Sequence, residues 1–246
     1  MKTLIFLLLA LTANGQNLIS NGSFETFSSL PTQSGDIDKA IGWFSNGGTP
    51  DYFHEFAAPI TGCNIPNTFV GDIPSAYEGK ACAGVCCYID NWADYREYLT
   101  QKLDTPLKKN HYYLLQFMVL TEVGFPCYYG GFTGDNFSVG LSKHKKAIQP
   151  TLTVQGQLFA NAWTMQSFIF QADSAYKYIT FGCFVDDSVQ QRHATAFSLT
   201  DAVYVFIDNV SLTEVYASAI EEHEKNALKF RFNYNLLGQR VKFAGK

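Results

Sequence analysis

The sequence contains no block of basic residues and has little charge of either sign. Charged side chains make up 16% of its 246 residues, and 18 Lys and Arg against 22 Asp and Glu give a formal net charge of -4. Nucleic acids and anionic membrane surfaces attract proteins through clustered Lys and Arg. The composition therefore argues against both kinds of partner and favours an uncharged one.

Long apolar runs are also missing after the first residues. A membrane-spanning helix needs about 18 or more consecutive apolar residues, and no such run follows residue 15. The chain opens with Met1 and Lys2, an apolar run over 4–11 that is too short to span a bilayer, and small residues over 12–15. This order is typical of a secretory signal peptide. Residues 1–15 are therefore predicted to be removed, after Ala13 or Gly15, and the mature chain to be secreted or held at the cell surface.

Sequence motifs of enzymes are absent as well. There is no GxSxG elbow, phosphate-binding loop or dinucleotide fingerprint, and His54-Glu55 does not begin an HExxH helix. Glycoside hydrolysis needs two acids that face each other across a cleft, whereas the neighbouring acids at 36/38, 186/187 and 221/222 are expected in loops or a solvated tail. The prediction is that the protein is not an enzyme. Acids that converge only in space leave a hydrolase as the least favoured alternative.

Six cysteines are present, but their spacing does not match a zinc site. Four of them lie in apolar runs, where a thiol behaves as a small buried hydrophobe: Cys82, Cys86, Cys87 and Cys183. Cys63 and Cys127 lie in loops rich in Gly and Pro. If an exported chain of this kind has one disulfide, these two are the favoured pair.

The residues that are abundant are those of β-strands. Phe, Tyr, Val and Thr recur in short runs separated by Gly, Asn and Pro, and only the tail after Ser218 has a helical composition. The pattern predicts one all-β domain over 16–217, an antiparallel β-sandwich or jelly roll. Its strands are expected at 80–89, 95–103, 111–121, 136–142, 162–171, 178–185 and 203–215.

Two motifs at the ends of this domain resemble a known superfamily. NLISNGSFE at 17–25, followed by Gly42-Trp43, and YVFIDNVSL at 204–212 are similar to the opening and closing strands of galactose-binding-domain-like jelly rolls. These include the carbohydrate-binding modules found beside xylanases and glucanases. The resemblance covers about residues 17–216. It implies a jelly roll whose first and last strands lie side by side, and carbohydrate or a cell-surface glycan as partner.

The resemblance also implies a metal site. Members of the superfamily commonly hold a structural calcium between an acid of the NGxFE turn and the Asp of the closing strand, positions that Glu25 and Asp208 occupy here. Two carboxylates repel each other unless a cation lies between them, and calcium prefers such hard oxygen ligands. The alternative is that Asp208 caps backbone amides and Glu25 is solvated. Phe24 and Trp43 are expected in the core.

A carbohydrate-binding module needs exposed rings with polar groups beside them. Trp92 has the best such surroundings, although aromatic residues make up 15% of the chain and many rings must fill the core. Core and ligand platform are therefore both open for Trp92. A second stretch of interest is DYFH at 51–54. The predicted ligand-binding residues are Trp92, Asp90, Asn91, Asp94, Arg96, Tyr128 and Tyr129.

The tail over 218–246 contains a last motif. YNLLGQRV at 234–241 resembles the centre of the C-terminal sorting domain used by type IX secretion, which implies the secretion machinery as a partner. The strands that normally follow are reduced to KFAGK. The alternative is an amphipathic tail that packs on the domain.

Taken together, three function classes are open. The favoured one is a noncatalytic carbohydrate-binding or surface-recognition domain. A structural or adhesive protein of the cell envelope is the second, and a hydrolase is the third.

Overall fold

The computed structural model describes residues 15–121, 128–145, 150–154, 158, 160–195 and 197–215. The predicted signal peptide, except Gly15, and the predicted sorting motif lie outside these residues. Two short 3-10 helices, η1 (Asp36–Lys39) and η2 (Pro59–Thr61), accompany the strands. The strands are Trp43–Ser45 (β1), Asp51–His54 (β2), Ala81–Ile89 (β3), Leu99–Lys102 (β4), Tyr112–Leu120 (β5), Tyr129–Gly134 (β6), Phe137–Ser142 (β7), Pro150–Thr153 (β8), Thr164–Gln171 (β9), Tyr178–Cys183 (β10), Arg192–Ala194 (β11) and Thr200–Val215 (β12).

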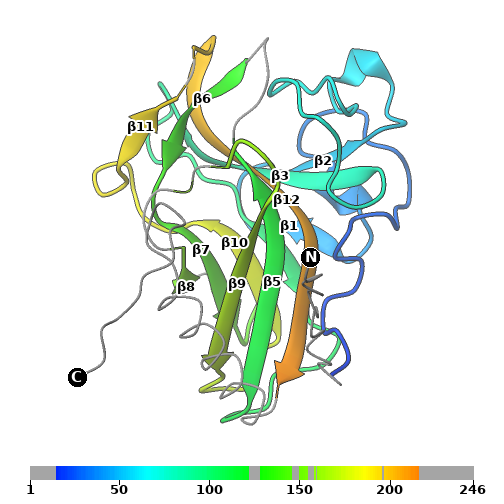
Figure 1. The fold of residues 1–246 in the computed structure, drawn as a ribbon, viewed down its shortest axis with the longest axis vertical. Helices are drawn as coiled ribbons and strands as arrows, with labels where there is room; N and C mark the ends of the chain where they lie inside the picture. The colour runs from blue at the N-terminus through cyan, green and yellow to red at the C-terminus, as the bar shows by residue number, and fades with distance from the viewer. Residues whose placement is uncertain are drawn as a thin grey trace, which may run out of the picture.

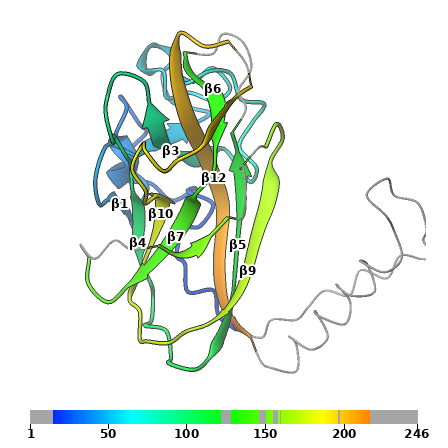
Figure 2. The ribbon, with the colours of Figure 1, turned by 90° about the vertical axis from the view of Figure 1, so that its left-hand side faces the viewer.

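The strands form two sheets that face each other (Figure 2). The smaller sheet has the order β1-β4-β10-β7-β8, and the larger one has the order β11-β6-β12-β3-β2, with β5 and β9 continuing it beside β12. Every pairing is antiparallel except that of β6 with β12. The predicted fold class, an all-β antiparallel sandwich, is confirmed. Within the described part of the chain, no helix is long and apolar enough to cross a membrane.

Strand β12 organises the larger sheet along the whole length of the molecule (Figure 1). Its first part pairs with β3 on one side and with β6 on the other, and its second part pairs with β5. The pairing with β5 shifts register between Asp208 and Ser211, next to Asn209 with its positive φ of 49°. This irregularity lets one strand serve two sets of neighbours.

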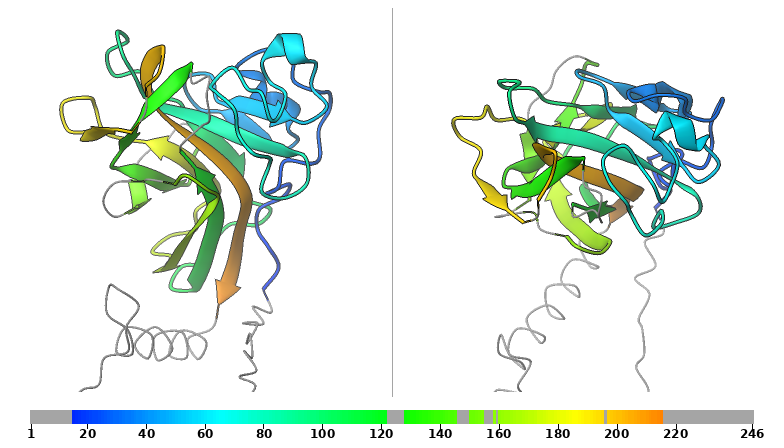
Figure 3. Two further views of the ribbon diagram at one scale, coloured as in Figure 1. Left: turned by 45° about the horizontal axis from the view of Figure 1, so that its top comes forward. Right: turned by 90° about the horizontal axis from the view of Figure 1, so that it is seen from above.

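The larger sheet is buried on both faces around β3 and the first half of β12, which explains why residues 81–89 and 202–207 are almost continuously apolar. Alternate β12 residues Val203, Val205 and Ile207 enter the main core between the sheets. Tyr204 and Phe206 point to a second apolar cluster on the outer face, with Phe53, Ile65 and Val70 among its members. The N-terminal segment, blue and cyan in Figure 3, supplies this cover on one side of the orange β12.

The expected strands match those observed, with one shortened. The ranges 80–89, 111–121, 136–142, 162–171, 178–185 and 203–215 contain β3, β5, β7, β9, β10 and nearly all of β12, whereas 95–103 is reduced to β4. The sequence did not predict β1, β2, β6, β8 or β11. These strands have three to six residues each, and β6 (YGGFTG) is rich in glycine. Such short segments are too short to show the alternation of apolar and polar residues that identifies a strand.

The opening and closing segments lie side by side, as expected. The Leu18 amide donates to the Leu212 carbonyl at 2.8 Å, and the Val210 amide donates to Gly22 at 2.9 Å. Phe24 and Trp43 are core residues, 0% and 2% exposed, and their rings stack with centroids 4.9 Å apart. Both predictions are confirmed.

Five cysteines are buried free thiols: Cys63, Cys82, Cys86, Cys87 and Cys183. The expectation of burial is confirmed for the four in apolar runs. Cys63 is also buried, beneath the segment that covers the outer face, and its thiol is free in the structure. Cys127, the partner favoured for it, lies outside the described residues.

Candidate functional site

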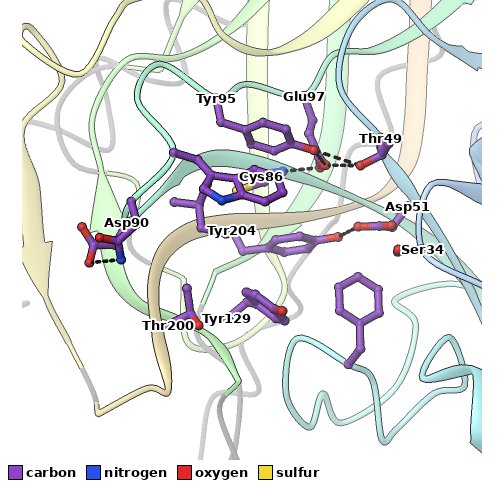
Figure 4. Close-up of a pocket in the computed structure, with 14 residues that line it drawn as sticks. Ser34, Thr49, Asp51, Cys86, Asp90, Tyr95, Glu97, Tyr129, Thr200 and Tyr204 are labelled. Atoms are coloured by element: carbon purple, nitrogen blue, oxygen red, sulfur yellow. Dashed lines mark hydrogen bonds between the residues drawn. The ribbon is translucent and has the colours of Figure 1, made fainter.

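A pocket of about 430 Å³ opens on the outer face of the larger sheet, beside the second apolar cluster. Its walls come from loops before β2, from β2, from the chain between β3 and β4, and from β6 and β12 (Figure 4). The lining combines rings with polar side chains: Ser34, Thr49, Asp51, Phe69, Cys86, Ile89, Asp90, Asn91, Trp92, Tyr95, Glu97, Tyr129, Thr200 and Tyr204.

Glu97 anchors one wall of the pocket through three short hydrogen bonds. Its Oε1 accepts from the hydroxyls of Tyr95 (2.7 Å) and Thr49 (2.9 Å), and its Oε2 accepts from the backbone amide of Cys86 (2.7 Å). Burial raises the pKa of the Glu97 carboxyl, and these donors oppose the increase. The carboxyl thus fixes the Tyr95 ring against the strand that carries Cys86.

Asp51 lies on the floor of the pocket and is 2% exposed. Its Oδ2 accepts from the Tyr204 hydroxyl at 2.5 Å, and its Oδ1 accepts from the Gly35 amide at 2.7 Å. Burial raises the pKa of Asp51 well above its ordinary value, and the charge of Glu97 raises it further. The pocket therefore brings together two buried carboxyl groups that resist being ionised at the same time.

Trp92 stands at the mouth of the pocket rather than in the core, because 60% of its surface is exposed. The turn that carries it has two non-glycine residues with positive φ, Asn91 (66°) and Asp94 (54°), residue types that tolerate this conformation. The Tyr95 ring packs edge-on against the Trp92 ring, with centroids 5.2 Å apart. One face of an exposed indole next to hydrogen-bonding groups is a suitable surface for stacking.

The Trp92 turn is fastened by side chains outside the pocket. Asp94 and Asp187 each accept the other's backbone amide, at 2.7 and 2.9 Å. Arg96 donates to Asp187 Oδ1 at 2.8 Å and also to the carbonyls of Val185 and Tyr95. The Arg96 side chain is only 6% exposed. Asp94 and Arg96 therefore hold the turn in place.

The structure brings together part of the predicted ligand site. Four of the seven predicted residues line the pocket, namely Asp90, Asn91, Trp92 and Tyr129. Asp94, Arg96 and Tyr128 are not among the lining residues of this pocket, and Tyr128 instead donates its amide to Val70 at 2.8 Å. Within the DYFH stretch only Asp51 lines the pocket, and Tyr52, Phe53 and His54 are buried elsewhere in the interior.

Sequence reasoning missed most of the opposite wall. Asp51 lies in the DYFH stretch, and Tyr95 directly follows the predicted ligand residue Asp94. Nothing in the neighbouring sequence indicated that Thr49, Glu97 or Tyr204 line a site. Glu97 follows Arg96 on an expected strand, so the two side chains point to opposite faces, and the sequence does not show which face borders a site. Only the pairing of β2 and β12 with β3 brings these residues to one place.

A second cavity of about 450 Å³ continues from the first and shares Asp90, Asn91 and Thr200 with it. It is bordered by Phe197 and Leu199, which are 80% and 70% exposed. The two cavities together form a recess on either side of the Asp90–Asn91 turn. A chain-like ligand could occupy both.

Glu25 and Asp208 lie together, as expected, and the backbone of residues 77–81 wraps around them. Asp208 accepts the amides of Tyr77 (2.8 Å) and Glu78 (3.0 Å) on Oδ2 and that of Asn209 (2.6 Å) on Oδ1. Glu25 Oε1 accepts the amides of Lys80 and Ala81 at 2.7 and 2.8 Å. Burial raises the pKa of Asp208 to about 7, against these donors, and the charge of Glu25 adds to the rise.

These contacts bear on the two interpretations of the pair. The interpretation without a metal predicted that Asp208 caps backbone amides, and it does. The same interpretation predicted a solvated Glu25, but Glu25 is hydrogen-bonded to backbone amides. These hydrogen bonds do not involve Glu25 Oε2, and they use only one of the two lone pairs of Asp208 Oδ1. Among the described residues, no group of three or more His, Cys, Asp or Glu side chains is placed to hold a metal. A cation here could use the two carboxylate oxygens but would need backbone carbonyls or water to complete its shell.

Comparison with known proteins gives no matching family model and no matching curated sequence. Among solved structures the chain is similar to the xylan-binding CBM22-1 domain of Paenibacillus barcinonensis Xyn10C, with 14% identity, a TM-score of 0.44, and coverage of 82% of this chain and 97% of that one. It is similar to the family 16 carbohydrate binding module-2 at 17% identity, TM-score 0.40, covering 80% and 99%. The CBM22-1–GH10 structure of Clostridium thermocellum Xyn10B, complexed with xylohexaose, matches at 14% identity and TM-score 0.44 over 82% of this chain. The chain spans only 29% of that two-module protein.

Proposed function

We propose that this protein is a noncatalytic module that binds carbohydrate in the pocket between Trp92 and Asp51. The observation that carries the proposal is the combination, in one open recess of about 430 Å³, of an exposed indole with carboxyl, amide and hydroxyl groups. A sugar ring offers an apolar C–H face that stacks on an aromatic ring and hydroxyls that need hydrogen-bond partners. The volume is within the usual range for small-ligand sites, about 300–1,000 Å³.

A hydrolase is less well supported, even though two acids do converge in the pocket. Asp51 and Glu97 both have raised pKa values, as general acids often do. They are nevertheless only 2% and 4% exposed, and both are engaged by hydrogen bonds from the protein itself. Because a glycosidase must present its carboxyl groups to the scissile bond, this arrangement favours binding over cleavage.

The test is a glycan array followed by a turnover assay on the same glycans. Binding without release of reducing ends is the expected result. Reducing ends that appear with wild type, and disappear with Glu97→Gln, would make the protein a hydrolase. An array without any signal would favour the structural or adhesive alternative, for which the exposed Phe197 and Leu199 offer a contact surface.

We propose further that the protein is exported and acts outside the cell or at its surface. The support is the leader over 1–15 and the YNLLGQRV segment of the tail, whose resemblance to a type IX sorting motif suggests a second export step. Both segments lie outside the described residues except Gly15. Deletion of the tail, argued in the Discussion, tests the second step.

Calcium between Glu25 and Asp208 is a separate proposal, with a structural role only. Its support is the approach of the half-buried Glu25 carboxyl to the buried Asp208 carboxyl, with Glu25 Oε2 and Asp208 Oδ1 as oxygen ligands. The five backbone amides already stabilise the pair, so the ion adds to an existing arrangement. Its effect should accordingly be moderate.

A further inference from the structure

The charged residues that line the pocket are all acidic, and this restricts the class of sugar that the pocket can bind. Three of its lining residues are acids, Asp51, Asp90 and Glu97, and none of the described lining residues is Lys, Arg or His. The base next to the pocket in the chain, Arg96, turns its guanidinium toward Asp187 and two backbone carbonyls. The Arg192 guanidinium lies outside the lining, 4.0 Å from the centre of the Tyr88 ring, so a ligand in the pocket meets three carboxyl groups and no basic side chain in the walls themselves.

The buried acids would gain from a positive charge in the recess. Asp51 and Glu97 are withdrawn from water, and each has a raised pKa because burial disfavours its ionised form. The charge of Glu97 adds to the effect at Asp51. A cation placed near two such groups favours their ionised forms and is itself held by them. An anion placed there would meet repulsion in a partly desolvated site.

The aromatic rings around the acids also favour a cationic ligand. Trp92, Tyr95, Tyr129 and Tyr204 line the same recess as the three carboxyl groups. The faces of aromatic rings attract cations, and acids beside rings are the usual surroundings of a bound ammonium group. At the rim, Asp90 is exposed, and among the described residues its carboxylate accepts hydrogen bonds only from the neighbouring Asn91 (2.9 Å) and, at 3.4 Å, from Tyr88. It is thus available to a ligand.

We propose that the pocket prefers a glycan that carries a protonated amine, such as an oligomer of glucosamine, over neutral sugars, and excludes acidic ones. The proposal rests on the function proposed above and adds the charge class of the ligand. Asp90 supplies the direct contact at the rim, Trp92 supplies the stacking surface, and the ammonium group of the ligand favours the ionised forms of Asp51 and Glu97 beneath. The order of affinity is amine first, neutral second and carboxylate last.

The experiment compares three oligosaccharides of equal length by calorimetry: tetramers of glucosamine, of N-acetylglucosamine and of galacturonic acid. The glucosamine tetramer is expected to bind about tenfold more tightly than its acetylated form, as one charge-assisted contact would give, and this ratio should shrink as salt increases. Binding of the galacturonic acid tetramer should be undetectable. Equal affinity for the first two, or measurable binding of the acid, overturns the inference.

Variants separate this inference from the proposed function. Asp90→Asn should lower the ratio between amine and acetylated tetramers, whereas Trp92→Ala should weaken both tetramers by a similar factor. If neutral glycans bind through Trp92 without any preference for the amine, the charge class is wrong and the carbohydrate function stands. If no glycan binds, the function fails as well. Spermine is the control for charge alone, and binding of spermine as tight as that of the amino sugar also overturns the inference.

Discussion

The hydroxyl of Tyr204 donates a hydrogen bond of 2.5 Å to the Asp51 carboxyl, although the two residues are 153 positions apart. Both reach this place because β2 and β12 pair with opposite edges of β3, where Gly84 faces Asp51 on one side and Phe206 on the other. A Cβ at Gly84 would overlap the phenol of Tyr204. Glycine at this position therefore makes room for the hydrogen bond that forms the pocket floor.

Trp92→Ala should weaken glycan binding strongly and leave stability almost unchanged. The indole is 60% exposed, and the removal of an exposed side chain typically changes the free energy of unfolding by about 0.5 kcal/mol or less. The matched control is Trp43→Ala, which removes a core ring and should cost about 3 to 5 kcal/mol. Glycan affinity and urea unfolding measure the two effects. Retained binding in Trp92→Ala would remove Trp92 from the site.

Arg96→Ala should destabilise the protein and weaken binding through the Trp92 turn. The substitution removes the salt-bridge partner of Asp187 and the guanidinium that donates to the carbonyls of Val185 and Tyr95. Breaking a buried ion pair costs about 3 to 5 kcal/mol, and the lower end is expected because a quarter of the Asp187 side chain is exposed. Circular dichroism melts and calorimetry at a temperature where the variant is folded are the measurements. Lost binding with unchanged stability would instead identify Arg96 as a ligand contact.

Stability should fall as pH rises above the ordinary range of a carboxyl, because of Asp51. Its folded-state pKa is raised, by burial first and then by the charges of Glu97 and Asp36, with Tyr204 opposing. The unfolded chain therefore loses this proton at lower pH than the folded chain, so the contribution of Asp51 is full below about pH 4 and decreases toward its raised folded pKa.

Asp51→Asn is the control for this pH dependence, because an amide does not titrate. Urea unfolding of wild type at about pH 5 and about pH 7.5 should show the decline, and the variant should show a smaller one. Equal slopes in the two proteins would mean that Asp51 is ionised in the folded state.

Calcium should raise the melting temperature, and chelator should reverse the increase. An ion that binds only the folded state adds about 2.7 kcal/mol at a concentration one hundred times its dissociation constant. Glu25→Gln is the informative variant, since its amide oxygen can still accept the amides of Lys80 and Ala81 while the carboxylate charge is gone. It should melt at the same temperature with and without calcium. A wild-type melt that EDTA leaves unchanged would leave the backbone amides as the only partners of the pair.

Deletion of residues 218–246 should leave a domain that is soluble and folds cooperatively, because β12 closes the larger sheet by Val215. If the tail is a sorting signal, the same deletion should trap the protein in the periplasm of the native host, since the proposed signal peptide would provide passage across the inner membrane only. Fractionation and a thermal melt measure the two outcomes. A melting temperature many degrees lower would place tail residues in the core, and normal arrival in the medium would show that the tail is no export signal.

The sequence by itself determined the sandwich and most of its strands, because the apolar runs and the apolar–polar alternation of the long strands indicate which of their residues are buried. Phe24 and Trp43 could be placed in the core, and the resemblance of the NLISNGSFE and YVFIDNVSL motifs to a known superfamily implied that the first and last segments lie side by side. Trp92 with Asp90 and Asn91 could be found too, since a ring among polar residues within one turn is a local signal.

Only the tertiary structure decided what faces Trp92 and what the nearby charges do. Asp51, Glu97 and Tyr204 meet because of strand pairing, and alternation along a strand tells which side chains are buried but not which strands become neighbours. Arg96 was predicted to contact a sugar. Its guanidinium instead binds Asp187, 91 positions away, and so stabilises the turn that carries Trp92. Likewise Glu25 and Asp208 were expected to lie together, but four of the five amides that hold them come from residues 77–81, whose sequence shows nothing of that role. Backbone donors belong to every residue, so only the path of the chain determines where they point.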